Sequence, residues 1–373
     1  MIKISQFPKY SFALTLAAAV VAACSSGGSS SFAPAGVTPA ARRTGLTMLA
    51  RMRDAALTMP HFVQPNVHRD GSASFIHDQR ERPNQIYVGD WSTNDVYVYN
   101  YPSGKAVGTL TGFDEPYGMC IDRKGDLFVT NFGNGEAVEY KHFSKKIINT
   151  YSPGGELIGC SVSAKGDVAL TSFDPGEVTI YPKGKATSGT TYSDSSCEYQ
   201  WTMGYDAKGD LVGVGEYSSV NVCALMAGSK SETTLTTSGI TVDFPAGTTW
   251  DGEYIALGDQ EAGGTYQTGV WPSTISGSTI TAAGSEVVFS DTCYSDYTDD
   301  VNPFFLDSPA VNITPKTKKQ AATMVGPNLW CVDAGSSKVD YWAYPAGGAP
   351  TGNLSSPPEE PYGSAVAATP GAK

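Results

Sequence analysis

Acidic and aromatic residues recur in this sequence of 373 residues directly after short apolar segments, and these side chains could do chemistry. Carboxylate and amide oxygens bind hard divalent cations, whereas flat aromatic rings stack on sugars, on other rings or on cationic groups. If the fold gathers these residues, the expected site is an acidic ring with an aromatic collar. Its members are Asp90, Trp91, Asn131, Phe132, Phe173, Glu216, Tyr217, Asp259 and Asp333, together with Tyr117 and Tyr362.

Each of these residues also has a purely structural interpretation. Asp and Asn cap the turn that follows a strand, and aromatic side chains pack between sheets. The structural role is the stronger interpretation for any single residue, so only the ring as a whole argues for binding. No cofactor is predicted beyond one divalent cation (Ca²⁺, Mg²⁺ or Zn²⁺), for which the candidate ligands are Asp90, Asn131, Glu216 and Asp259.

Catalysis has little support, and no catalytic residue is assigned. Of the four histidines, only His142 lies within the region that carries the ring, and it falls on an expected outer strand. A Ser-His-Asp triad or a histidine acid/base at the ring is therefore not expected. An enzyme would have to use metal-bound carboxylates.

A repeat of about 40 to 45 residues positions these side chains. Its clearest copy runs from Asp114 to Tyr140, with an apolar strand, an Asp122-Arg-Lys-Gly125 turn and two further strands. Gly118 and Gly159 lie 41 residues apart, as do Gly125 and Gly166. Four short strands per unit at this period are the signature of a β-propeller.

The ends of the repeat region predict how the ring closes. Glu115-Pro-Tyr-Gly118 recurs as Glu360-Pro-Tyr-Gly363, whereas the first unit, from Asn84, lacks an innermost strand. The C-terminal strand is therefore expected to complete the first blade, which removes an unpaired sheet edge. We expect an all-β, six-bladed propeller over residues 85–367; seven blades would require splitting the long last unit.

The motif of the clearest copy, from Pro116-Tyr-Gly to Asp126-Leu-Phe-Val-Thr-Asn131, resembles NHL-type repeats. It is similar more broadly to six-bladed propellers such as gluconolactonase and regucalcin. The lactonase branch implies one divalent metal held by a Glu, an Asn and an Asp. Asn131 and Asp259 fit that set, but the Glu has no counterpart. The streptogramin-lyase branch implies a catalytic His at the mouth, which this chain lacks, and NHL proteins without enzymatic residues are binding platforms.

The N-terminus resembles a bacterial lipoprotein signal peptide over residues 1–23. Lys3 and Lys9 precede the apolar run Phe12–Ala23, and Val21-Ala-Ala-Cys24 matches a lipobox with Cys24 as the lipidated residue. An ordinary secretory signal is the alternative. Ser25 after the cysteine implies the outer membrane. Residues 24–84 are expected to form a tether and linker with a short helix at about 40–57, and residues 368–373 a tail.

Six cysteines remain when Cys24 is set aside, and an even number in an exported chain favours disulfides. No Cys-x-x-Cys pair occurs, which argues against a zinc knuckle. From their places in the repeat, the expected pairs are Cys120–Cys160, Cys197–Cys223 and Cys293–Cys331.

Composition excludes some classes of partner. The formal net charge of −12 argues against nucleic acid, and no apolar run of transmembrane length follows the leader. The sequence thus favours a monomeric, non-catalytic binding or scaffold propeller in the cell envelope, with a protein, glycan or small molecule as its partner. Contact with the membrane would be through the lipid anchor alone. The alternative is a metal-dependent lactonase or hydrolase, and a purely structural surface protein also stays open.

Overall fold

The computed structural model describes residues 74–76, 85–101, 103–216, 219–264, 267–289, 305–307, 328–333, 337–354, 357–358 and 361–367. All of them belong to one compact unit. Strands dominate the described residues, whose helices are two short 3-10 turns, Pro182–Gly184 and Ala262–Gly264. None of these helices has the length and hydrophobicity that crossing a membrane requires.

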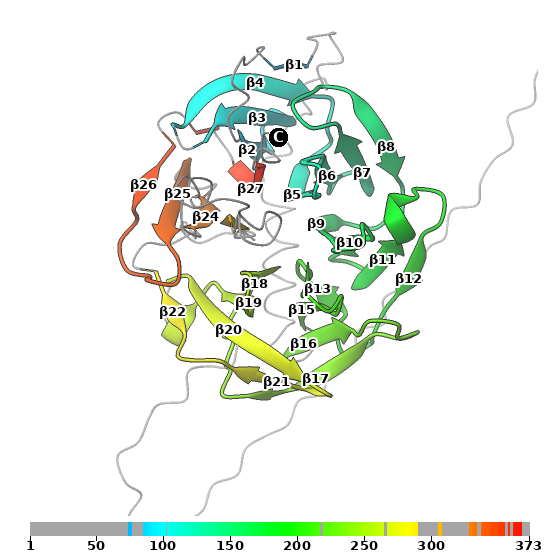
Figure 1. Ribbon diagram of the computed structural model, residues 1–373, viewed down its shortest axis with the longest axis vertical. Coiled ribbons are helices and arrows are strands. Elements are labelled where there is room, and N and C mark those ends of the chain that lie inside the picture. The colour runs from blue at the N-terminus through cyan, green and yellow to red at the C-terminus, as the bar shows by residue number, and fades with distance from the viewer. Residues whose placement is uncertain are drawn as a thin grey trace, which may run out of the picture. The chain divides into compact units, whose positions relative to one another are not determined.

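The strands form sheets arranged around a centre (Figure 1), and neighbours within each sheet mostly follow one another in sequence. The first sheet contains, in spatial order, β1 (Phe75–Ile76), β4 (Lys105–Thr111), β3 (Asp95–Asn100), β2 (Gln85–Asp90) and β27 (Pro361–Ala367). The second contains β5 (Pro116–Ile121), β6 (Leu127–Asn131), β7 (Glu136–Tyr140) and β8 (Ile147–Tyr151). The third contains β9 (Leu157–Val162), β10 (Val168–Ser172), β11 (Glu177–Tyr181) and β12 (Thr190–Tyr192).

A ten-stranded sheet follows and consists of two groups. The first group is β13 (Tyr199–Gln200), β14 (Gly204–Tyr205), β15 (Leu211–Glu216), β16 (Val220–Leu225) and β17 (Thr233–Ser238). The second is β18 (Pro245–Trp250), β19 (Ile255–Asp259), β20 (Gly269–Ser276), β21 (Thr279–Ala282) and β22 (Val287–Val288). Pairs are antiparallel within each group, and the outer strands β17 and β21 pair in parallel.

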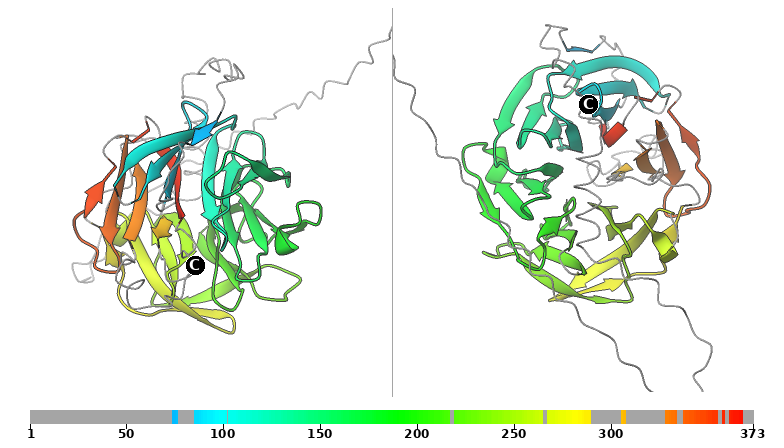
Figure 2. Two further views of the ribbon diagram at one scale, coloured as in Figure 1. Left: turned by 45° about the horizontal axis from the view of Figure 1, so that its top comes forward. Right: turned by 180° about the vertical axis from the view of Figure 1, so that it is seen from behind.

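The last sheet contains β23 (Phe305–Asp307), β24 (Asn328–Asp333), β25 (Lys338–Ala343) and β26 (Gly352–Asn353). Innermost strands contact one another in a closed circuit: β27 with β5, β5 with β9, β9 with β14, β14 with β18, β18 with β23, and β23 with β27. Figure 2 shows the same circular arrangement from behind. The described residues therefore form an all-β, multi-bladed propeller with almost no helix.

The C-terminal strand closes the circle, as the repeated Glu-Pro-Tyr-Gly motif predicts. Strand β27 pairs with β2 from Gln85 opposite Ala367 to Asp90 opposite Pro361. The backbone of Gly363 packs so tightly on β5 that a Cβ atom there would overlap the carbonyl oxygen of Tyr117. Only glycine allows this approach.

The turns between the first two strands of a unit form as the sequence predicts. The Asp122 carboxylate accepts hydrogen bonds from the backbone N–H groups of Lys124 and Asp126, and Asp206 does the same in its own turn. Gly125 and Gly209 close these turns with φ of +83° and +91°, which a side chain disfavours. Asp122 thus has the turn role that the repeat predicts, and Asp206 has the same role in its own unit.

Apolar cores lie between neighbouring sheets. Val96 and Val98 of β3 share one core with Leu127 and Val129 of the next sheet. β-Branched and aromatic residues are frequent in the strands, which suits pleated sheets whose second strands, such as β2 and β6, are buried on both faces.

Most of the predicted leader and linker, including Cys24 and the short helix at 40–57, lies outside the described residues. The predicted tail, residues 368–373, lies outside them as well. One difference from the expected linker is β1, which pairs with β4 through Phe75 opposite Thr109. Two residues are too few to produce an alternating pattern, so this strand has no sequence signal.

Candidate functional site

The aromatic residues expected at the propeller mouth form one contiguous cluster. Trp91, Phe132 and Phe173 each come directly after the second strand of their sheet. Tyr117 and Tyr362 lie near the start of innermost strands. We name the whole set the mouth cluster: Trp91, Tyr117, Phe132, Ile158, Phe173, Tyr199, Trp201, Phe244 and Tyr362.

Trp91 lies at the centre of one half of the mouth cluster. Its ring centroid is 4.3 Å from that of Tyr362, 5.6 Å from Phe132 and 6.2 Å from Tyr117. All three pairs are close to edge-to-face, the arrangement that the aromatic quadrupole favours. Trp91 and Phe132 are partly exposed, so this half presents ring surface to solvent.

The other half of the mouth cluster comes from the third sheet and the ten-stranded sheet. Phe173 lies 5.4 Å from Tyr199 and 5.5 Å from Trp201, measured between ring centroids. Trp201 in turn lies 5.9 Å from Phe244. Tyr199 and Phe244 are partly exposed.

One backbone hydrogen bond, repeated in successive units, explains why these residues meet. The N–H of Phe132 donates to the carbonyl of Glu115, and the N–H of Phe173 donates to that of Glu156. Gln260 donates to Phe244 in the same way. Each bond ties the residue after a second strand to the residue before an innermost strand, so the repeat itself assembles the mouth.

The carboxylate of Asp90 and the amide of Asn131 are buried and cap turns. Asp90 Oδ1 accepts hydrogen bonds from Ser92 Oγ at 2.7 Å and from the N–H of Thr93 at 3.1 Å. Asn131 Oδ1 accepts one from the N–H of Asp114 at 3.1 Å. These oxygens therefore cap turns, which is the structural interpretation that stands against metal binding.

Asp259 is capped most completely. Its carboxylate accepts hydrogen bonds from the N–H groups of Asp243 at 2.8 Å, Phe244 at 3.0 Å and Glu261 at 2.8 Å. Complete burial raises the pKa of Asp259 to about 6, although the three backbone N–H groups act in the opposite direction. Asp259 therefore anchors the start of β18 beside Phe244.

Glu216 differs from the other expected acidic residues. It ends β15 directly opposite Tyr199 of the mouth cluster, so the two side chains lie on the same face of the sheet. Its exposed fraction is 6%, and burial raises its pKa to about 7. Among the described residues its carboxyl accepts no turn hydrogen bond, which leaves it available to a ligand.

Two predicted mouth residues receive no structural account. Tyr217 lies outside the described residues, and for Asp333 only the backbone, at the end of β24, is described.

Sequence reasoning did not assign four members of the mouth cluster as site residues: Ile158, Tyr199, Trp201 and Phe244. Phe244 had a usable signal, because Asp243-Phe-Pro245 repeats the pattern of Asp114-Glu-Pro116 before an innermost strand. Tyr199 belongs to a two-residue strand with no periodicity to reveal it.

Buried polar atoms near the mouth have hydrogen-bonding capacity that the described residues do not use. They include Ser172 Oγ at the end of β10, Trp201 Nε1, Thr248 Oγ1 in β18 and Gln260 Oε1. Buried polar groups are normally paired, so these atoms can serve a polar ligand.

Two disulfides join the pairs expected from the repeat. Cys120–Cys160 links β5 to β9 of the neighbouring sheet, with a Cα–Cα distance of 5.7 Å. Cys197–Cys223 links the segment before β13 to β16, at 6.4 Å. Cys331 is also disulfide-bonded, but its predicted partner Cys293 lies outside the described residues.

Comparison with known proteins shows the fold alone. No protein-family profile and no curated protein matches the sequence. The solved nidogen/laminin complex is similar over 77% of this chain and 99% of that chain, with 11% identity and a TM-score of 0.55. A functionally unknown protein from Desulfotomaculum acetoxidans DSM 771 is similar over 76% and 99%, with 10% identity and a TM-score of 0.50.

A streptogramin B lyase also matches over 80% of this chain and 91% of that chain, with 12% identity and a TM-score of 0.47. Identities this low transfer no function, because unrelated activities share the same propeller. The chain is thus similar in fold to the nidogen and Desulfotomaculum structures, as an all-β, propeller-like protein.

Proposed function

We propose that this chain is a non-catalytic binding propeller whose ligand or protein partner docks on the mouth cluster. The observation that carries the proposal is the meeting of eight aromatic rings from separate segments, four of them partly exposed, beside the carboxyl of Glu216. Rings with an adjacent carboxyl favour an aromatic or cationic group, or a sugar face that stacks on the rings.

The architecture that we propose is an NHL-type propeller of six blades. The closed circuit of innermost strands supports this count, because β27, β5, β9, β14, β18 and β23 each represent one blade. The ten-stranded sheet then contains two blades, whose strands are joined into one sheet by the parallel pairing of β17 with β21.

We further propose display in the bacterial cell envelope as a lipoprotein anchored at Cys24. Support comes from the sequence of residues 1–24, which combines basic residues, an apolar run and a lipobox-like ending. The nidogen structure was solved in complex with laminin, which supports this fold as a protein-binding surface.

The second candidate function is a metal-dependent lactonase or hydrolase that uses mouth carboxylates. The acidic residues at the ends of second strands favour it. Against it, Asp90, Asn131 and Asp259 are engaged in turn hydrogen bonds, whereas the carboxyl of Glu216 accepts none among the described residues. We therefore prefer the binding module.

Metal addition separates the two functions. The protein without its leader is melted in EDTA and then with Ca²⁺, Mg²⁺ or Zn²⁺ added. We expect the melting temperatures with and without metal to agree within about 1 °C, since an ion that binds only the native state would raise the melting temperature. A rise of several degrees that disappears in Asp259→Asn would instead support the hydrolase, and ester hydrolysis would be assayed next.

Binding at the mouth cluster predicts a specific response to small probes. Titration with phenyltrimethylammonium chloride, followed by tryptophan fluorescence, is expected to saturate in the wild type and to weaken at least tenfold in Trp91→Ala. Glu216→Gln is expected to weaken this cationic probe but not phenol, which carries no charge.

The matched control is Trp271→Phe, a tryptophan on β20 outside the mouth cluster. It should bind both probes as the wild type does. Equal binding by Trp91→Ala and the wild type would refute docking at this cluster.

A further inference from the structure

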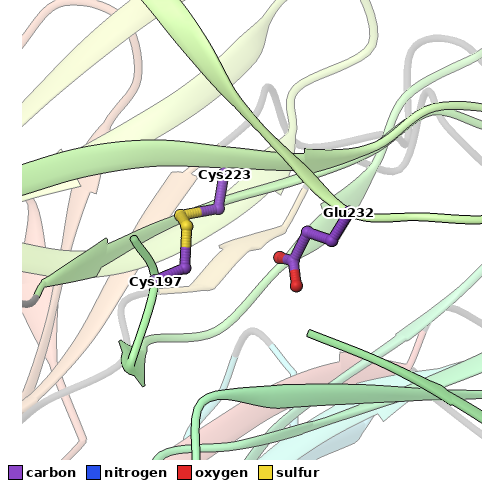
Figure 3. Close-up of side chains that lie close together, drawn as sticks. All are labelled: Cys197, Cys223 and Glu232. Carbon is purple, nitrogen blue, oxygen red and sulfur yellow. A yellow bond between two sulfur atoms is a disulfide. The ribbon is translucent and has the colours of Figure 1, made fainter. Parts of the chain in front are cut away.

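A carboxyl group lies beside the Cys197–Cys223 disulfide in the interior of the propeller (Figure 3). Both sulfur atoms and a carboxylate oxygen of Glu232 lie within 4.8 Å of one another. The exposed fractions are 0% for both cysteines and 4% for Glu232. Figure 3 shows the carboxyl group directed toward the disulfide.

Strand register explains why Cys223 and Glu232 meet at this point. Cys223 of β16 lies opposite Gly213 of β15 and opposite Thr234 of β17, so all three share one face of the sheet. Glu232 precedes Thr234 by two residues, and alternate residues of an extended chain point to the same face.

Gly215 makes room for the group on the same face. A Cβ atom added to Gly215 would lie 3.0 Å from Cys223 Sγ and 3.1 Å from the Cβ of Cys197. Contacts this short would force the cysteines to shift. The absence of a side chain at Gly215 therefore leaves space for the two cysteine side chains.

The polar groups of this site are incompletely paired. Gln200 Nε2 donates a hydrogen bond to Glu232 Oε1, which orients the carboxyl group. Glu232 Oε2 and Gln200 Oε1 are buried and have no hydrogen-bonded partner among the described residues. No salt bridge to Glu232 is found there either. A carboxylate buried without a cationic partner is costly, so this carboxyl group either holds a proton or binds a cation.

We propose that reduction of the Cys197–Cys223 disulfide creates a zinc site, with the two sulfur atoms and the Glu232 carboxylate as ligands. A dithiol reductant supplies two electrons and two protons, becomes a disulfide itself and leaves two thiols. Zn²⁺ then binds both thiolates and the Glu232 carboxylate, and the protons of these three groups leave to solvent. A water molecule takes the fourth position of the tetrahedron.

The ligand chemistry selects the metal and the cysteine pair. Thiolates favour Zn²⁺ over Ca²⁺ or Mg²⁺, which prefer oxygen ligands. Zn–S bonds of about 2.3 Å at the tetrahedral angle place the two sulfur atoms about 3.8 Å apart, so the sulfur atoms must separate once the S–S bond is broken. Among the described residues, no other group of His, Cys, Asp or Glu is close enough to hold an ion, so Cys120–Cys160 lacks a third ligand. The disulfide and the metal site exclude each other, which makes zinc binding dependent on redox state.

The first experiment uses the full exported chain, reduced with tris(2-carboxyethyl)phosphine and titrated with Co²⁺ as a spectroscopic substitute for Zn²⁺. We expect one thiolate-to-cobalt absorption band with tetrahedral d–d transitions, displaced by one equivalent of Zn²⁺. Cys120→Ser/Cys160→Ser should keep this band, whereas Cys197→Ser/Cys223→Ser should lose it. Retention of the band in Cys197→Ser/Cys223→Ser would overturn the proposal.

A second variant avoids reduction of the other disulfides. Cys223→His frees Cys197 and offers a Cys, His and Glu ligand set in the otherwise oxidised protein. We expect it to bind one Zn²⁺, and Cys223→His/Glu232→Gln to bind at least tenfold more weakly. Circular dichroism would establish that both variants are folded. Absence of zinc binding by folded Cys223→His, or equal affinity in the two variants, would contradict Glu232 as a ligand.

Discussion

Deletion of residues 361–373, which contain β27, is expected to abolish cooperative unfolding of the propeller. The deletion removes all the backbone pairing between β27 and β2, from Gln85 to Asp90, and exposes the edge of β2. It also removes Tyr362, a fully buried side chain that packs on Trp91 and Tyr117. Loss of one large buried aromatic side chain alone costs about 3–5 kcal/mol, which is a large share of the stability of a domain.

The measurement is thermal and urea unfolding, followed by circular dichroism and tryptophan fluorescence. A synthetic peptide of residues 357–373 added to the deleted protein should restore a cooperative transition, because the strand pairs without a covalent link. If the deletion variant unfolds as cooperatively as the wild type, closure by β27 is dispensable.

A single substitution tests the same contact without removing the strand. Gly363→Ala places a methyl group against the carbonyl of Tyr117, and we expect a loss of at least 2 kcal/mol, in the range typical of overpacking. Gly284→Ala is the matched control, because a Cβ atom at Gly284 meets nothing within 4 Å. If the two substitutions have equal effects, the tight approach of β27 to β5 is not important for stability.

The closure of the propeller by β27 and several aromatic residues of the mouth cluster could be predicted from the sequence, because both depend on repeated motifs. The recurrence of Glu-Pro-Tyr-Gly identifies β27 as an innermost strand, and Trp91, Phe132 and Phe173 occupy one position of the repeat. The link between β17 and β21 could not be predicted, because outer strands carry no conserved position within the repeat. Their parallel pairing arises only when two units meet in space.

The role of the acidic residues could not be predicted from residue type. A carboxylate after a strand can point to solvent, or it can accept hydrogen bonds from the N–H groups of the next turn. An Asp residue can do either, so its type does not decide between them. Asp259 makes three such bonds, whereas Glu216, one methylene longer and opposite Tyr199, makes none among the described residues. Glu232 gave no sequence signal, because its neighbours in space come from the register of β15, β16 and β17.

Stability of the wild-type protein is expected to fall as the pH rises from about 5 to 8. Burial raises the pKa of Glu216 from 4.5 to about 7, and it also raises the pKa values of Glu232 and Glu286, to about 8 and about 7. Between the unfolded and folded pKa values the folded state holds more protons than the unfolded state, so raising the pH favours unfolding. The contribution is fully present below the unfolded pKa and is lost as the pH rises through the folded pKa.

Glu216→Gln isolates the part of this effect that belongs to the mouth. The full shift corresponds to about 3.4 kcal/mol at 1.36 kcal/mol per pKa unit, of which about 2.5 kcal/mol is lost between pH 5 and pH 8. For a domain of this size, the difference in melting temperature between pH 5 and pH 8 should therefore be roughly 4–10 °C smaller in the variant than in the wild type. The control is Glu198→Gln, which removes one charge from an exposed side chain and should follow the wild type. Parallel pH profiles for Glu216→Gln and the wild type would mean that Glu216 is ionised in the native protein throughout this range, and that its carboxyl group is well solvated at the mouth.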